Sequence, residues 1–248
     1  MIVKNRLLNF GNMIIYQDDD YFAFSLDSVL LSNFVTVNLR DKVIVDFCTG
    51  NAPIPMLLTY RTKALIYGIE VQKEIYDLAL DSIIENNMSK QITLYNDDVK
   101  NILNYFDRES VDIVTANPPY FKVNSSSYVN DNVIKRNARH ENLITLEQII
   151  YNASLILKKG GTFTMVHRPD RLIEIIMLLK KYNIEPKRVR FVSPKEGHEA
   201  NILLIEGLMN GKEGLKVLPS LVVYDRNNNY TKEIKDMFGD DTHVAKQL

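Results

Sequence analysis

Four consecutive residues, Asn117-Pro118-Pro119-Tyr120, bring together a carboxamide, two rigid rings and an aromatic face. An exocyclic amine on a base or an amide is a poor nucleophile, because its lone pair is delocalised into the π-system. Two acceptors that bind its N–H groups favour a pyramidal nitrogen, and the Asn117 side-chain oxygen and the Pro118 carbonyl supply them. The Tyr120 ring would stack on the target base. The electrophile that this chemistry requires is a methyl donor held in line.

The same tetrapeptide also fits an ordinary turn, so its surroundings must decide between the two interpretations. Val111–Ala116 is a short apolar run rich in β-branched residues, which predicts a buried parallel strand. The two prolines end that strand, because neither donates a backbone N–H. The turn therefore lies past the carboxyl end of a strand, where open α/β sheets bind their ligands.

The strand at 42–47 and the turn after it predict a cofactor-binding unit. The strand ends in Asp46, and Thr49 and Gly50 lead into a helix. Gly50 permits a close backbone approach, and the helix N-terminus supplies free N–H groups. The turn lacks the G-x-G-x-x-G dinucleotide fingerprint. We expect Asp46 to take the positive amino group of a bound amino-acid moiety, and Cys48 to be a packing residue.

Two later strands also end near acidic residues. Glu70 follows the strand at 64–69, at the place where a carboxylate binds ribose hydroxyls in doubly wound cofactor domains, although an exposed strand-end charge is the alternative. Asp98 follows the strand at 92–95 and is a candidate for the cofactor's adenine amino group. A helix N-cap explains Asp98 equally well.

The N-terminal region predicts a helix from Asp27, with Ser25 or Asp27 as its N-cap. Capping alone accounts for Asp27. The alternative is that this element covers the cofactor, with Phe24 and Ser25 near it.

Composition and charge limit the function classes. The chain has 248 residues, an apolar fraction of 46% and a net charge of −1, which describes one sizeable domain and excludes a global polycation. Residues 158–195 contain ten Lys or Arg against three Asp or Glu, which fits either a phosphate-binding face or a solvated helix and strand. One cysteine excludes a disulfide framework. Neither a signal peptide nor a long apolar run is present, so we expect a cytoplasmic location and no membrane contact.

The expected organisation is a segment at 1–40 that packs on the cofactor site, a main domain at 41–210 and a C-terminal extension at 211–248. A long polar loop at 121–145 follows the tetrapeptide and could close over a substrate. His140 in this loop either contacts RNA or orients the loop. For His167, at the end of the next strand, a buried or capping role is expected rather than a catalytic one.

The order and spacing of these motifs resemble the class I S-adenosylmethionine-dependent amino-methyltransferases. Over residues 10–235 the chain resembles, more closely, the bacterial tRNA (adenine-N6)-methyltransferases that modify the adenine beside the anticodon of valine tRNA. The stretches that carry this likeness are 24–31, 46–50, 117–120, 138–141 and 199–207, with Glu70 and Asp98. The family has a second glycine in its cofactor turn, and Ala52-Pro53 stands in that place here.

The resemblance implies a doubly wound, mostly parallel α/β sheet of the class I methyltransferase (Rossmann-like) type with an antiparallel last strand. It implies S-adenosyl-L-methionine as cofactor, the anticodon stem-loop of tRNA as substrate, direct methyl transfer, and neither a metal nor DNA. The catalytic residues are then Asn117, Pro118, Pro119 and Tyr120. The cofactor-binding residues are Ser25, Asp27, Asp46, Thr49, Gly50, Glu70, Val71, Asp98 and Asn117. The RNA-binding residues are Lys122, Arg136, Arg139, His140, Arg168, Arg171, Lys187, Arg188, Arg190 and Lys195.

Three rival functions remain open. Release-factor glutamine methyltransferases share the tetrapeptide but typically carry an added N-terminal helical domain, and only about 40 residues precede the first strand of the cofactor unit. Ribosomal RNA guanine-N2 and DNA adenine methyltransferases share the chemistry. A non-catalytic RNA-binding scaffold is the third rival. The sequence does not decide between a monomer and a dimer.

Overall fold

The structure of this chain is a computed structural model that describes residues 2–7, 13–18, 25–120 and 143–239. The predictions made for Phe24, Lys122, Arg136, Arg139 and His140 lie outside these residues.

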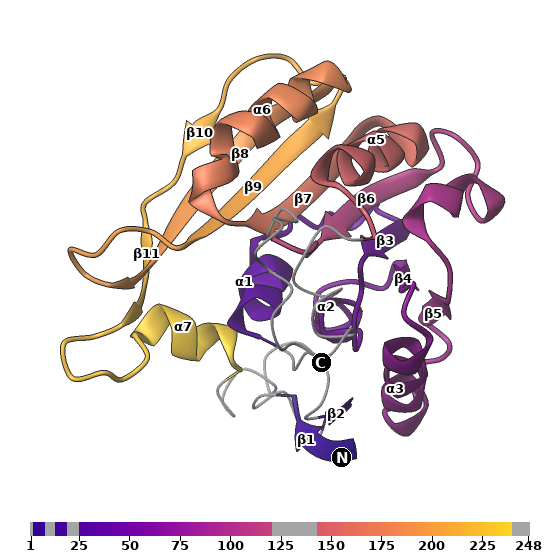
Figure 1. Cartoon of the computed structure of the whole chain (residues 1–248), viewed down its shortest axis with the longest axis horizontal. Helices are drawn as coiled ribbons and strands as arrows, with labels where there is room; N and C mark the ends of the chain where they lie inside the picture. Colours follow the sequence, from indigo (N-terminus) through magenta and orange to yellow (C-terminus); the bar gives the residue numbers. More distant parts are fainter. Residues whose placement is uncertain (1, 8–12, 19–24, 121–142, 240–248) are drawn as a thin grey trace.

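A nine-stranded sheet forms the centre of the molecule (Figure 1), in the order β10-β8-β9-β7-β6-β3-β4-β5, with β11 also paired to β8. Its strands are β3 (Val43–Phe47), β4 (Leu65–Ile69), β5 (Ile92–Tyr95), β6 (Val111–Ala116), β7 (Leu157–His167), β8 (Ile184–Lys195), β9 (Ile202–Met209), β10 (Lys216–Val217) and β11 (Leu221–Tyr224). Every pairing is parallel except those of β9, which runs antiparallel to both β7 and β8. This is the predicted sheet with its antiparallel last strand.

Helices cover both faces of the sheet. The helices are α1 (Leu26–Phe34), α2 (Pro53–Leu58), α3 (Lys73–Glu85), α5 (Leu146–Ile156), α6 (Leu172–Lys181) and α7 (Lys232–Met237), with 3-10 turns η1 (Val99–Asn104) and η2 (Pro169–Arg171). Alternate strand residues face opposite layers, as in Ile44, which packs with α1 and α2, and Val45, which packs with α5 and α6. Figure 1 shows α5 and α6 on one side of the sheet and α1 and α2 on the other. Both faces of the central strands are therefore buried, as expected for parallel strands.

A pair of glycines is an ordinary helix end, but Gly160 and Gly161 do not end α5. The helix ends at Ile156, and Leu157 is already extended and paired with Val111 of β6. Gly160 has a φ of 79°, and the register of β6 and β7 shifts in this region. The glycines therefore form an irregularity inside β7, because the strand begins earlier than predicted and must bend to remain paired.

A row of polar side chains crosses the sheet beneath α1. Asp46, Thr115, Thr164 and Glu206 are in register on β3, β6, β7 and β9, and each is at most 5% exposed. Glu206 accepts hydrogen bonds from the Thr36 backbone N–H and hydroxyl, at 2.9 and 2.8 Å. The row therefore fixes the chain just after α1 to the sheet, since its buried carboxylates require these partners.

Both terminal regions pack on the main domain. The hairpin of β1 (Ile2–Arg6) and β2 (Ile14–Asp18) lies against α3, where the Ser82 hydroxyl accepts from the Tyr16 N–H at 2.9 Å. At the other end, β11 extends the sheet, and Ile234 of α7 is fully buried in the core that includes α1. Within the described part of the chain, every helix is too short or too polar to cross a lipid bilayer.

Candidate active site

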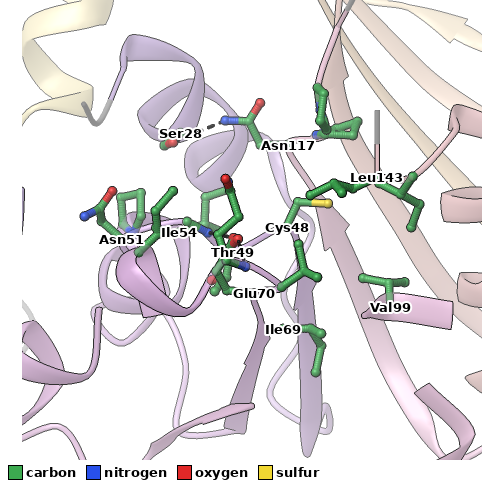
Figure 2. Close-up of a pocket in the computed structure, with 18 of the residues that line it drawn as sticks. Ser28, Cys48, Thr49, Asn51, Ile54, Ile69, Glu70, Val99, Asn117 and Leu143 are labelled. Carbon is green, nitrogen blue, oxygen red and sulfur yellow. Dashed lines mark hydrogen bonds between the residues drawn. The ribbon is translucent and has the colours of Figure 1, made fainter. Parts of the chain in front are cut away.

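A cavity of about 370 Å³ lies at the carboxyl ends of β3, β4, β5 and β6. The turns after these strands supply Thr49, Glu70, Asp98 and Asn117 to its wall, and Gly50 also lines it. Figure 2 shows Asn117 and Glu70 on different elements around this space. The parallel strands bring residues far apart in sequence to one edge, because their carboxyl ends coincide there.

The turn after β3 has an unusual backbone. Cys48, Gly50 and Ala52 have φ values of 55°, 57° and 63°. A left-handed conformation costs a non-glycine residue roughly 1 kcal/mol, so the surrounding structure must enforce it. Ala52 adopts at that cost the geometry that glycine adopts freely, and Pro53 begins α2 directly after it. The left-handed turn is thus present without a second glycine.

Asp46 does not line the cavity. Its side chain is fully buried, and its two oxygens accept hydrogen bonds from the hydroxyls of Thr49, at 2.7 Å, and Thr115, at 2.5 Å. Burial raises the pKa of this carboxyl to about 7, and the two hydroxyls act in the opposite direction. The expectation that Asp46 pairs directly with a bound amino group is therefore corrected. Strand alternation directs it beneath the turn, where it holds Thr49.

Glu70 lines the cavity and also organises the turn. Its carboxylate is 6% exposed and accepts backbone N–H groups from Gly50, at 3.0 Å, and Gln72, at 2.9 Å. Burial raises the pKa of Glu70, and these backbone donors oppose the rise. Each carboxylate oxygen has a second lone pair, so Glu70 can accept further hydrogen bonds from a ligand in the cavity.

The remaining residues predicted to bind the cofactor have different positions. Val71, Asp98 and Asp27 line the cavity, whereas Ser25 does not. Asp98 is also the N-cap of η1, since its side chain accepts from the Lys100 N–H at 2.9 Å. Both interpretations of Asp98 therefore fit its position.

The N-terminal turn of α1 contacts the Asn-Pro-Pro-Tyr turn directly. The Tyr120 hydroxyl lies 2.9 Å from Asp27 Oδ2 and 2.7 Å from Asn117 Oδ1. Asn117 Nδ2 donates to the Ser28 hydroxyl at 3.4 Å, which Figure 2 marks with a dashed line. These bonds orient the Asn117 amide, with its oxygen toward Tyr120 and its nitrogen toward α1. Ser25 is the N-cap by position but makes no side-chain cap, and Asp27 bonds Tyr120.

His167 is buried beside Tyr120, as its predicted structural role requires. It is 1% exposed, its Nδ1 accepts from the Arg168 N–H at 2.8 Å, and its ring centroid lies 5.1 Å from that of Tyr120. Burial lowers the pKa of His167 to about 4, so the ring is neutral at pH 7. It therefore forms part of the packing against Tyr120.

Cys48 lines the cavity, and burial raises the pKa of its thiol, which does not favour a nucleophilic role.

The structure does not gather the predicted basic residues on one face. Arg168 and Lys195 end β7 and β8 at the edge that carries Asn117. Lys187 lies near the other end of β8, roughly 26 Å from Lys195 at the usual rise per residue. The predicted basic residues are therefore spread along the length of β8, and their RNA-binding role stays a prediction.

Three of these basic residues pair closely with glutamates of the same chain. Arg171 is 8% exposed and pairs with Glu174 at 2.7 Å. Arg188 pairs with the buried Glu206 at 2.9 Å, and Arg190 pairs with Glu233 of α7 at 2.7 Å. Their guanidinium groups are engaged in ion pairs within the chain, and an RNA-binding role for them stays a prediction.

Two residues of this site were missed by the sequence reasoning. Thr115 holds Asp46, and Ser28 holds Asn117. A polar residue inside the apolar β6 run was a usable signal for Thr115. Ser28 gave none, because serine is ordinary in the first turn of a helix.

No family model matches the chain. It is 24% identical over 237 residues to a tRNA1(Val) (adenine(37)-N6)-methyltransferase of Bacteroides thetaiotaomicron, covering 95% of this chain and 96% of that one. It is 21% identical over 240 residues to the protein of the same name from Christiangramia forsetii, covering 96% and 98%.

Solved structures share the architecture. A predicted O-methyltransferase from Agrobacterium tumefaciens superposes with a TM-score of 0.69 at 21% identity, covering 86% of this chain and 95% of that one. A geranyl diphosphate C-methyltransferase from Streptomyces coelicolor, in complex with S-adenosyl-L-homocysteine, superposes with a TM-score of 0.54 at 13% identity, covering 73% and 76%. The fold is that of the class I methyltransferases.

Proposed function

We propose that this protein is an S-adenosylmethionine-dependent methyltransferase that forms N6-methyladenosine in tRNA, at adenine 37 of valine tRNA. The observation that carries the proposal is the position of Asn117 on the wall of the cavity formed by the turns after β3, β4 and β5. A donor in that cavity and an amine at Asn117 would share one compartment, as in-line transfer requires. The names of the two relatives support the choice of tRNA and of adenine.

The cavity residues suit the proposed cofactor. Glu70 supplies a carboxylate for the ribose hydroxyls, Asp98 an acceptor for the adenine amino group, and Gly50 a turn without a side chain in the way. Thr49 is held by Asp46, so the shape of the turn depends on a buried bond. The cofactor supplies an activated methyl group, and the protein residues bind and orient it.

Asn117 and Pro118 bind and orient the target amine. The Asn117 oxygen and the Pro118 carbonyl accept the two N–H groups of the target amine, while Tyr120 stacks on the base. With S-adenosylmethionine bound, the amine so held would attack the methyl carbon, S-adenosylhomocysteine would leave as the bond from sulfur to methyl breaks, and the proton released from nitrogen would pass to solvent. The proposed reaction uses neither a covalent enzyme intermediate nor a metal. Arg168 and Lys195 are the basic residues best placed for the tRNA backbone, since they end strands at the same edge.

Radiolabelled methyl transfer to total tRNA, followed by mass spectrometry of the nucleosides, tests the substrate. The expected product is N6-methyladenosine, at position 37 of valine tRNA. Methylated guanine, or a methylated glutamine in a release factor, would instead support one of the rival functions.

Replacing Asn117 tests the mechanism. We expect Asn117→Ala to lower kcat at least 100-fold, because one acceptor of the amine is lost, and to leave the affinity for S-adenosylhomocysteine within about threefold. Asn227→Ala, which changes an exposed asparagine in the C-terminal turn, is the matched control and should retain wild-type kcat. Unchanged turnover in Asn117→Ala would remove Asn117 from the mechanism.

A further inference from the structure

The Tyr120 hydroxyl has two acceptors and one proton. It lies 2.7 Å from Asn117 Oδ1 and 2.9 Å from Asp27 Oδ2. A phenol donates one hydrogen bond at a time, so the two acceptors compete for it. When it bonds Asn117, it uses one of the two lone pairs of Oδ1, the oxygen that a substrate amine also needs, and two donors on one oxygen weaken each other's bonds. The hydroxyl is therefore a competitor of the substrate amine for the full strength of this acceptor.

Tyr120 remains a donor throughout the neutral pH range. Its side chain is half-buried, and desolvation together with the neighbouring Asp27 carboxylate raises the pKa of the phenol well above its ordinary value. The hydroxyl therefore keeps its proton, and the only variable is the acceptor to which it donates. The ring is held against His167, with 5.1 Å between ring centroids, so a change of acceptor requires little movement.

Asp27 is fixed in position by the helix that carries it. At the far end of α1, Arg61 donates to the carbonyl oxygens of Ser32 and, at 2.9 Å, Val35. Arg188 donates to a third carbonyl of that turn at 2.6 Å. Cations at the C-terminus of a helix also suit its dipole. These contacts anchor α1 to the turn after α2 and to β8, so its first turn presents Asp27 to Tyr120 as a fixed acceptor.

We propose that Asp27 is a positioning residue that takes over the Tyr120 hydrogen bond when a substrate amine occupies Asn117 Oδ1. The inference rests on the proposed function, because it assigns Asn117 Oδ1 to the amine. No proton is transferred: the hydroxyl rotates from one acceptor to the other. Asp27 thus stabilises the substrate-bound arrangement and keeps the hydroxyl away from the incoming N–H group. This role differs from binding the cofactor, which was the role expected for Asp27.

A double-mutant cycle tests the exchange. The cycle measures kcat for methyl transfer to tRNA with the wild type, Asp27→Ala, Tyr120→Phe and the double variant, at saturating cofactor. We expect Asp27→Ala to lower kcat about tenfold in the wild-type background and less than about threefold in the Tyr120→Phe background. Tyr120→Phe removes the hydroxyl that competes for Asn117 Oδ1, so Asp27 no longer has a hydrogen bond to accept in that background. Asp27→Asn keeps an acceptor oxygen and should restore kcat to within about threefold of the wild type.

Two controls separate this role from others. Asp27→Ala should bind S-adenosylhomocysteine within about twofold of the wild type by calorimetry. Asp41→Ala removes a half-buried carboxylate that precedes β3, accepts from the Asn38 N–H and is not part of the cavity wall, and it should change kcat equally little in both backgrounds. Should Asp27→Ala fail to fold, Asp27→Ser completes the cycle, because its hydroxyl is too short to reach Tyr120.

The outcomes distinguish the two proposals. Equal losses from Asp27→Ala in both backgrounds would overturn the inference and leave the proposed function in place. A parallel loss of affinity for S-adenosylhomocysteine would also overturn it, in favour of a cofactor-binding Asp27. Failure of the wild-type protein to methylate adenine in tRNA would overturn the proposed function, and the inference with it.

Discussion

Asp46 and Glu70 follow the same sequence pattern and have different tasks. Each carboxylate lies at the carboxyl end of a parallel strand, on neighbouring strands, and each is at most 6% exposed. Asp46 has both oxygens bonded to the hydroxyls of Thr49 and Thr115 and does not reach the cavity. Glu70 bonds backbone N–H groups and lines the cavity.

The difference lies in the position of each residue relative to its strand. Asp46 is still inside β3, so the pleat directs its side chain beneath the turn. Glu70 follows the last residue of β4, where the chain leaves the sheet toward the cavity. Glu70 lies two register positions beyond Asp46, one residue past the end of its strand, and this step out of the sheet makes it a ligand-facing carboxylate rather than a supporting one.

The largest effect is expected from removing Glu70, the carboxylate of this pair that lines the cavity. Glu70→Ala should weaken S-adenosylmethionine binding about 100-fold, because hydrogen bonds to a charged acceptor are among the strong ones. Calorimetry measures the dissociation constant. Glu70→Gln keeps one acceptor and should lose less. An affinity within threefold of the wild type for Glu70→Ala would contradict a ligand-facing role.

A smaller effect, on stability rather than on cofactor affinity, is expected from removing Asp46. Asp46→Ala leaves two buried hydroxyls without their acceptor, so its free energy of unfolding at pH 6 should fall by about 2 kcal/mol. Urea denaturation measures this, with Thr62→Ala as a control that changes a threonine outside the Asp46 contacts. The affinity for the cofactor should fall only slightly, because Asp46 affects the cavity only through the position of Thr49. A large loss of affinity at unchanged stability would return Asp46 to the ligand-binding residues.

The smallest effect is a dependence of stability on pH. The folded-state pKa of Asp46 is about 7, against about 3.9 for an unfolded aspartate, so the native state holds the extra proton between these values. The stabilisation from Asp46 is therefore complete below pH 4 and is lost as the pH rises through 7. Asp46→Asn does not titrate, so the wild type should gain Tm relative to this variant as the pH falls from 8 to 5. A constant difference in Tm over that range would contradict the assignment.

Much of the fold followed from the sequence because it depends on local pattern. Apolar runs such as 111–116 predicted the strands, and the structure places that strand at Val111–Ala116. The Asn117 and Glu70 positions at strand ends indicated the edge where the cavity lies. Gly160 and Gly161 lie inside β7 rather than at the end of a helix, and the sequence could not decide between these because both have the same local signal.

The contacts that orient the site were beyond such reasoning. The bond between Asp27 and Tyr120 joins residues 93 positions apart, and that between Thr115 and Asp46 spans 69. The basic residues between 158 and 195 are close in sequence but separated in space by the length of β8. Proximity in the chain therefore failed as a guide to a common surface.

By itself, the sequence determined the residue types that meet at the carboxyl edge of the sheet, because strand ends and turn residues are encoded locally. Only the tertiary structure decided which carboxylate faces the cavity, which arginines form internal ion pairs and which hydroxyl competes for Asn117. The physical reason is that the direction of a side chain depends on the pleat and on packing partners from distant elements, and neither is written in the neighbouring residues.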